Sequence, residues 1–224
     1  MATKKKTTEQ PAELTEQQKQ EEAKKKHLEE MKKEAIAVLK KAAGDREGVD
    51  YIIEDLEKNG FFTAPASGGN HGHVEGGLLE HSLNVLHNAE KISAALIGTK
   101  NITPDMKNSI AICALLHDYG KVGDFGKQFY VPNILKSGNV STAKPWQRNK
   151  DLTNIPHGIR SIILVERWME LKEDEEYAIA YHDGLYEPSN VSVIKGHETQ
   201  ILMIIHWADM WASHVQEGES ADDE

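Results

Sequence analysis

The chain has 224 residues, 39% of them hydrophobic, which allows one domain with a buried core. Its formal net charge of −10 argues against a protein that coats duplex nucleic acid, and its apolar runs fall short of the roughly 20 residues that cross a bilayer. The single cysteine, Cys113, excludes an internal disulfide framework, and because the N-terminus resembles no secretory signal we expect a cytoplasmic protein.

Both ends of the chain are polar. Residues 1–34 are rich in Lys, Glu and Gln and contain no aromatic or β-branched aliphatic residue. They cannot bury enough apolar surface to offset their ordering entropy, so we expect a charged tail that is disordered or a solvated helix. Residues 216–224 form a second, acidic tail. One folded domain is therefore expected over residues 35–215.

Helical patterns begin with the predicted domain. Residues 35–43 and 49–58 have helical periodicity, and the second pattern ends at Asn59 and Gly60, a typical helix stop. Residues 61–77 are too rich in Gly and Pro for the interior of a helix or strand. We expect an ordered loop there.

The remaining patterns predict an all-α domain with one insertion. Residues 78–96 are helical, and Thr103 with Pro104 provides an N-cap and a first turn for the next helix. The helical period fails over residues 120–156, where turn residues around Ser137 predict an irregular loop or a short β-ribbon. Further helices are predicted over residues 157–171, 173–182 and 198–215. The predicted fold is a helical bundle with this irregular or β-ribbon insertion.

Six imidazoles and carboxylates lie on or at the ends of these apolar helices. They are His81, His117, Asp118, His157, His182 and Asp209. A buried charge is costly unless it is paired or coordinated, and both side-chain types bind divalent cations. The six residues predict a dinuclear centre with Asp118 as the bridging carboxylate, suited to two ions of Mn²⁺, Fe²⁺, Mg²⁺, Co²⁺ or Ni²⁺.

The pattern His81, then His117-Asp118, then Asp209 resembles the HD-domain superfamily of metal-dependent phosphohydrolases over about residues 47–215. The additional histidines resemble its dinuclear branch, which includes HD-GYP cyclic-dinucleotide phosphodiesterases and diadenosine tetraphosphate hydrolases. The loop before the first ligand is similar to a subgroup common in phage and prophage, and to the HD module of bacterial 3′→5′ exoribonucleases. The chain lacks the HHExxDGxGYP run of the HD-GYP members, which argues against cyclic dinucleotides as substrate.

Other side chains are candidates for substrate contact. The resemblance implies that Lys121 of HDYGK helps to bind phosphate. The segment from Lys121 to Arg160 contains seven basic residues and two acidic ones. This excess of positive charge indicates either an anion-collecting flap or an ordinary solvated loop. Within it we consider Arg160 as a phosphate clamp or a solvated arginine, and Lys144 and Arg148 as substrate contacts. His71 is a candidate for substrate contact or proton transfer, or a plain surface residue.

These residues together predict an enzyme. It would cleave a phosphate ester or anhydride of a nucleotide-type substrate with metal-activated water, with Asp118, Lys121 and His71 as catalytic candidates. The alternative is a 3′→5′ exonuclease on single-stranded RNA or DNA, for which Trp146 is a base-stacking candidate. A third hypothesis is a non-catalytic binding module of the same fold. The expected partners are a nucleotide or another phosphorylated small molecule and, under the alternative, single-stranded nucleic acid, with no membrane association.

Overall fold

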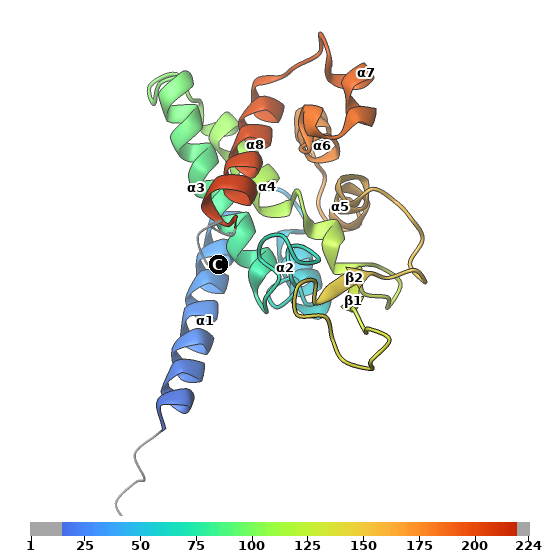
Figure 1. Cartoon of the computed structure of the whole chain (residues 1–224). Helices are drawn as coiled ribbons and strands as arrows, with labels where there is room; N and C mark the ends of the chain where they lie inside the picture. Colours follow the sequence, from blue (N-terminus) through green and yellow to red (C-terminus); the bar gives the residue numbers. More distant parts are fainter. Residues whose placement is uncertain (1–14, 219–224) are drawn as a thin grey trace, which may run out of the picture.

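The computed structural model describes residues 15–218 and has the predicted all-α fold (Figure 1). The α-helices are α1 (Glu16–Ala43), α2 (Val49–Lys58), α3 (Gly77–Leu96), α4 (Pro104–Leu116), α5 (His157–Val165), α6 (Glu173–Ala180), α7 (Val191–Ile194) and α8 (Gln200–Trp211). The two strands are β1 (Tyr130–Pro132) and β2 (Trp146–Arg148), and the connections include the 3₁₀-helices η1 (Tyr119–Val122), η2 (Gly184–Tyr186) and η3 (Pro188–Asn190) and the π-helix η4 (Ala212–Gln216).

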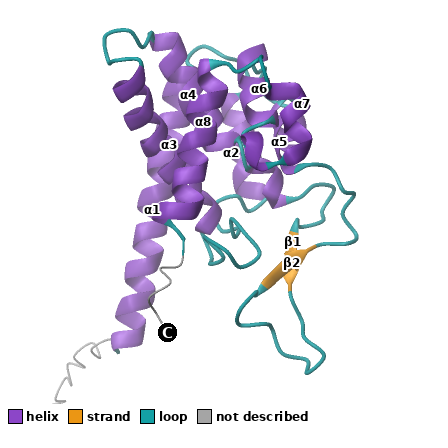
Figure 2. Ribbon diagram, turned by 45° about the horizontal axis from the view of Figure 1, so that its top comes forward, coloured by secondary structure: helices purple, strands orange, loops and turns teal. Residues whose placement is uncertain are grey.

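Helices α3, α4 and α8 pack against one another at the centre of the molecule, with α1 alongside α3 and α4, and α6 against α4 and α8 (Figure 2). Leu79, Ile112 and Leu202, one from each central helix, are fully buried in a single apolar cluster. Because each helix carries its polar ligands among such residues, packing the apolar faces also brings the ligands inward. No helix in residues 15–218 has the length and apolar character needed to cross a membrane.

Two predicted helix boundaries depend on their capping residues. The Thr103 side chain accepts a hydrogen bond from the Met106 amide (3.1 Å), and Pro104 begins α4. Helix α2 ends at Lys58, and Gly60 follows with φ of 76°, a conformation that favours glycine. Both boundaries are confirmed.

Helix α1 continues without a break across the boundary placed between residues 34 and 35. Residues 1–14 and 219–224 of the two predicted tails lie outside the described residues. The N-terminal half of α1 is mostly exposed, whereas Ala35 and Leu39 are buried in the core. The described part of the predicted N-terminal tail is therefore a solvated helix that is continuous with a core helix.

The predicted ribbon is present in the insertion. Strands β1 and β2 pair antiparallel with Val131 opposite Gln147. The ribbon is fixed to the loop before α3, because the Trp146 indole donates to the His73 carbonyl (2.8 Å) and the Trp146 amide donates to the Gly68 carbonyl (3.2 Å). Two segments far apart in the sequence are thus held side by side.

Helix α5 is shorter than predicted, since it ends at Val165 and not near residue 171. The Glu166 carboxylate accepts a hydrogen bond from the Leu171 amide (2.5 Å), which satisfies a backbone donor outside a helix. Met169 is buried in the turn, so its apolar side chain contributes to the core without helical backbone. Periodicity alone could not separate this buried turn from a helix end.

Candidate metal centre

The six predicted ligands come together from five parts of the chain. His81 lies on α3, His117 and Asp118 follow directly after α4, and Asp209 lies on α8. His157 begins α5, and His182 follows α6. All except His157 and Asp209 have side chains at most 2% exposed. The predicted convergence is therefore found in the structure.

Asp118 lies between two pairs of imidazoles. Its Oδ2 atom is 3.5 Å from the Nε2 atoms of both His81 and His117. Its Oδ1 atom is 3.2 Å from His157 Nε2 and 3.5 Å from His182 Nε2. Asp209 joins the first pair, with Oδ1 3.2 Å from His81 Nε2. The two oxygens of one carboxylate thus face two separate groups of nitrogen ligands.

The other ring nitrogens orient the imidazoles. His117 Nδ1 lies 2.9 Å from the Ala114 carbonyl, and His182 Nδ1 lies 2.8 Å from the Ile179 carbonyl. A carbonyl accepts only, so each Nδ1 carries a proton and each Nε2 atom faces inward. His81 Nε2 and His117 Nε2 are 3.3 Å apart, and His157 Nε2 and His182 Nε2 are 3.0 Å apart. Two ring nitrogens that face each other at these distances repel through their lone pairs, so a positive charge between them would stabilise the arrangement.

The pKa shifts show how strongly the cluster attracts positive charge. Burial alone lowers the pKa of His81, but its hydrogen bonds to Asp209 and Glu217 outweigh burial and raise it to about 10. The pKa of His182 is lowered by burial and raised by Asp183 and Asp118, with a net rise to about 9. Burial raises the pKa of Asp118, yet Lys121 and the imidazoles hold it well below its ordinary value.

The residues fit divalent cations. Asp118 Oδ1 is buried and has no hydrogen-bond partner, although an unsatisfied buried carboxylate oxygen is costly. Two sets, His81 with His117 and Asp209, and His117 with Asp118 and His182, each bring their ligand atoms within 4.8 Å of one another. Mixed imidazole and carboxylate ligands are typical of first-row transition metals.

Close packing of η1 on α5 holds His157 at the centre. A Cβ atom on Gly120 would lie 2.1 Å from the His157 carbonyl oxygen, a backbone atom that cannot move aside by itself. We expect Gly120→Ala to push α5 away from Asp118 and to lower the free energy of unfolding by about 1–3 kcal/mol through overpacking. Urea denaturation and metal titration would measure both effects, and a variant equal to wild type in both would contradict this account.

Lys121 and His71 lie beside the ligands. The Lys121 ammonium donates to Asp118 Oδ2 (2.5 Å), and its side chain is 13% exposed. The His71 ring lies 5.2 Å from the His81 ring, and its buried Nε2 has no hydrogen-bond partner. Burial lowers the pKa of His71 to about 4, so the ring is neutral near pH 7. Their catalytic roles stay predictions.

The other predicted substrate contacts lie in the insertion or beneath it. Arg160 is buried and donates to the Thr153 carbonyl (2.7 Å), so it fixes the end of the insertion. Arg148 is exposed, and its guanidinium stacks over the Phe129 ring at 4.8 Å. Lys144 is exposed in the loop that joins β1 to β2. Contacts from these three side chains to a substrate stay predictions.

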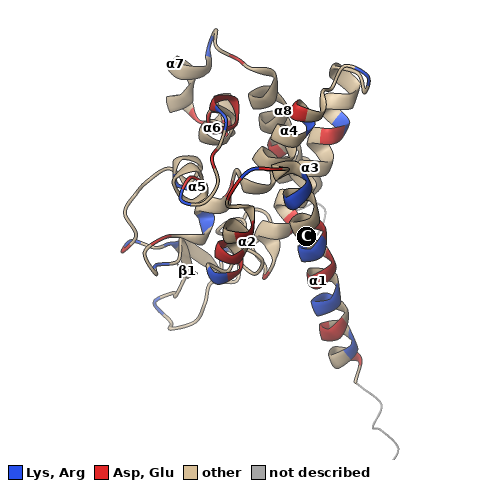
Figure 3. Cartoon of the chain, turned by 180° about the vertical axis from the view of Figure 1, so that it is seen from behind, with Lys and Arg blue, Asp and Glu red and all other residues tan. Residues whose placement is uncertain are grey.

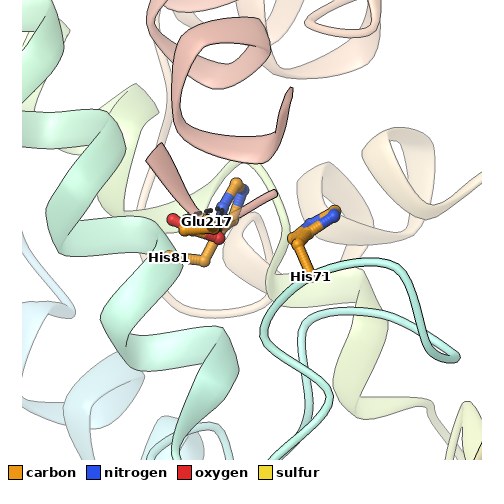
Figure 4. A group of neighbouring side chains, drawn as sticks. All are labelled: His71, His81 and Glu217. Atoms are coloured by element: carbon orange, nitrogen blue, oxygen red, sulfur yellow. Dashed lines mark hydrogen bonds and ion pairs between the residues drawn. The ribbon is translucent and has the colours of Figure 1, made fainter. Parts of the chain in front are cut away.

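Two acidic residues near the ligands were missed in the sequence. Asp183 Oδ2 lies 3.6 Å from His157 Nε2, and its signal was available because His182-Asp183 repeats the His-Asp dipeptide. Glu217 Oε2 lies 3.1 Å from His81 Nδ1 (Figure 4). It falls in the segment interpreted as a polar tail, and the sequence carries no signal that would place it here.

A cavity of about 400 Å³ opens beside Lys121. Its walls come from the loop before α3 and from the insertion, and its aromatic lining is Phe129, Tyr130 and Trp146. Thr63 and Glu75 also line it. Because Lys121 contacts both this cavity and Asp118, the cavity adjoins the ligand cluster.

A family model described as the HD domain matches residues 78–209, which is more than half of the chain and includes all six predicted ligands. No curated protein and no solved structure matches the chain.

Proposed function

The chain belongs to the HD-domain family, and we propose that it is a phosphohydrolase that uses two divalent cations. The observation that carries the proposal is the position of Asp118, whose two oxygens face His81 and His117 on one side and His157 and His182 on the other. In the proposed centre Asp209 completes the first group and Asp183 the second. Such an arrangement suits one carboxylate shared by two ions.

The chain's own residues would bind and orient the phosphate. Bound divalent cations supply Lewis acidity and lower the pKa of coordinated water. Lys121 carries a positive charge at the boundary of the cavity and the ligand cluster, where it would hold a phosphoryl oxygen. His71 lies beside the cluster with a buried, unpartnered Nε2, where it would contact the substrate or take part in proton transfer. No nucleophilic side chain of the protein is required.

A nucleotide-type substrate is supported by the aromatic cavity. Trp146 and Tyr130 would pack against a base while Lys121 holds the phosphate.

We expect Trp146→Ala to raise KM about tenfold and to change kcat little, since stacking on one aromatic ring is worth about 1–3 kcal/mol. Steady-state kinetics would test this. Two control variants accompany it. Trp146→Phe keeps an aromatic ring at the same position. Trp168→Ala removes an exposed indole elsewhere, one that stacks on Tyr51. An unchanged KM in Trp146→Ala would contradict the base-binding role.

A 3′→5′ exonuclease is the second candidate, and the charge of the insertion favours it. Figure 3 marks Lys and Arg positions along the insertion in blue. Five of its basic residues are exposed. They are Lys127, Lys136, Lys144, Arg148 and Lys150. A polymer with several phosphates would use such a surface, and its binding would weaken steeply with added salt.

One experiment separates these functions. Metal content is measured by elemental analysis of purified protein, and then mononucleotides and a labelled oligonucleotide are assayed with the metal found and with Mn²⁺. Hydrolysis of mononucleotides supports the leading proposal, and shortening of the oligonucleotide from its 3′ end supports the exonuclease. Absence of hydrolysis throughout would overturn both and leave the non-catalytic binding module.

A further inference from the structure

The π-helix η4, which follows α8, places two polar side chains on two of the ligands. Ser213 Oγ donates to Asp209 Oδ1 (3.1 Å). The Glu217 carboxylate accepts from His81 Nδ1, with both oxygens within 3.2 Å (Figure 4). Both residues lie beyond residues 78–209, the part that the HD family model matches. The family resemblance therefore says nothing about them.

The wider π-turn accounts for the position of Glu217. The Glu217 amide donates to the Ala212 carbonyl (2.8 Å), five residues earlier, where an α-helix would bond four residues earlier. The extra residue changes the direction in which the chain leaves α8. Instead of continuing along the helix axis, the segment turns onto α3, where His81 lies. π-turns of this kind occur often at functional sites.

A ladder of amide side chains holds this segment on α3. Asn84 Nδ2 donates to Glu217 Oε1 (2.8 Å), and Gln216 Nε2 donates to Asn84 Oδ1 (2.9 Å). Asn88 Nδ2 donates to Gln216 Oε1 (2.9 Å). The Glu217 carboxylate, 11% exposed, is thus fixed from both sides. Its contact with His81 is built by several hydrogen bonds and does not depend on one surface rotamer.

We propose that Glu217 and Ser213 are positioning residues of the metal centre. Glu217 holds His81 with the proton on Nδ1, so that the Nε2 lone pair faces the cation, and Ser213 fixes the carboxylate of Asp209. A carboxylate on the outer nitrogen of a ligating imidazole fixes the ring orientation and raises ligand basicity. The inference rests on the proposed function, since it requires cations at this cluster. It assigns the effect to the ion bound by His81 and Asp209, and not to the ion bound by His157 and His182.

Metal titration of the full chain tests the proposal. Metal-free wild type and Glu217→Ala are titrated with Mn²⁺ by calorimetry and by electron paramagnetic resonance. Glu217→Ala is expected to weaken one of two Mn²⁺ sites by about 10–100-fold and to leave the other unchanged. Glu217→Gln should recover part of the affinity, because its amide oxygen accepts the same hydrogen bond without the charge. Glu80→Gln removes an exposed carboxylate next to His81 in the sequence and should have no effect.

The outcomes separate this inference from the proposed function. If wild type binds no Mn²⁺, the metal centre itself fails, and this inference with it. If wild type binds two ions and Glu217→Ala binds both equally well, only the positioning role is wrong. Loss of one whole Mn²⁺ equivalent in both Glu217→Ala and Glu217→Gln would also overturn the positioning role. Glu217 would then be a direct metal ligand together with His71 and His81. Ligand atoms of these three residues lie within 4.8 Å of one another.

A spectroscopic measurement adds a quantity that would not change if Glu217 only stabilised the fold. Co²⁺ replaces Mn²⁺, and its visible absorption reports the ligand field at each site. The proposal expects Glu217→Ala and Ser213→Ala to shift the band of the same ion, with Glu217→Gln closer to wild type. Thermal unfolding in the presence of a chelator checks that each variant remains folded. Identical Co²⁺ spectra in all of them would contradict the proposal.

Discussion

Replacement of Asp118 by alanine is expected to remove both turnover and bound metal. In the described part of the chain, Asp118 is the only carboxylate within ion-pair distance of both imidazole pairs. Metal-ion stabilisation of the reacting phosphate is worth several kcal/mol, so we expect turnover to fall about a thousandfold or more. Steady-state assay and elemental analysis of the purified variant measure the two losses together.

Two further variants make this result interpretable. Asp118→Asn keeps the size of the side chain and an acceptor oxygen for Lys121, but it cannot supply two anionic oxygens. It should therefore fold normally and still lose metal. Asp151→Ala removes an exposed carboxylate from the insertion and should keep full activity. Wild-type turnover by Asp118→Ala with metal still bound would refute the proposed centre.

The ligands could be predicted because each one breaks a strong local pattern. His117 and Asp118 end an apolar helix, and Asp209 lies within one, so a polar side chain at these positions needs a partner. Helical periodicity then gives the face on which each one lies. Turn residues around Ser137 indicate either a β-ribbon or an irregular loop, and the structure has the ribbon.

The residues that escaped prediction depend on contacts between distant segments. Glu217 and His81 are 136 positions apart, and their contact requires a π-turn that no residue pattern announces. The cavity beside Lys121 requires the ribbon to pack on the loop before α3 through Trp146. The sequence makes Arg160 a candidate for phosphate binding, but its burial beneath the insertion follows from packing of α5 on η1. Sequence periodicity describes single elements and does not contain such pairings.

Outside the metal centre, we expect the ion pair between Arg46 and Glu175 to make a large contribution to the free energy of unfolding. The guanidinium donates to both carboxylate oxygens, at 2.6 and 2.7 Å, and the Glu175 side chain is fully buried. The pair ties the turn after α1 to α6, the helix that leads to His182. Removing one partner of a buried pair leaves an uncompensated charge, so we expect Arg46→Ala to lower the free energy of unfolding by about 3 kcal/mol. Lys40→Ala, which breaks an exposed pair with Asp50, should cost less than about 1 kcal/mol.

The effect of Arg46→Ala should also depend on pH. Burial raises the pKa of Glu175, but the hydrogen bonds from Arg46 and the Lys172 amide outweigh it and lower the pKa from its ordinary value of 4.5. A group whose pKa is lowered by folding stabilises the protein above its unfolded pKa, and that contribution is lost as pH falls through the folded value. In Arg46→Ala burial acts on Glu175 without Arg46 to oppose it, so the variant protonates this carboxylate at higher pH than wild type. The difference between the two proteins should therefore be largest near pH 7 and shrink as Glu175 becomes protonated in acid, first in the variant and then in wild type. Urea denaturation in a chelator at several pH values measures it, and a difference that stays constant into acid would show that Glu175 is not the group responsible.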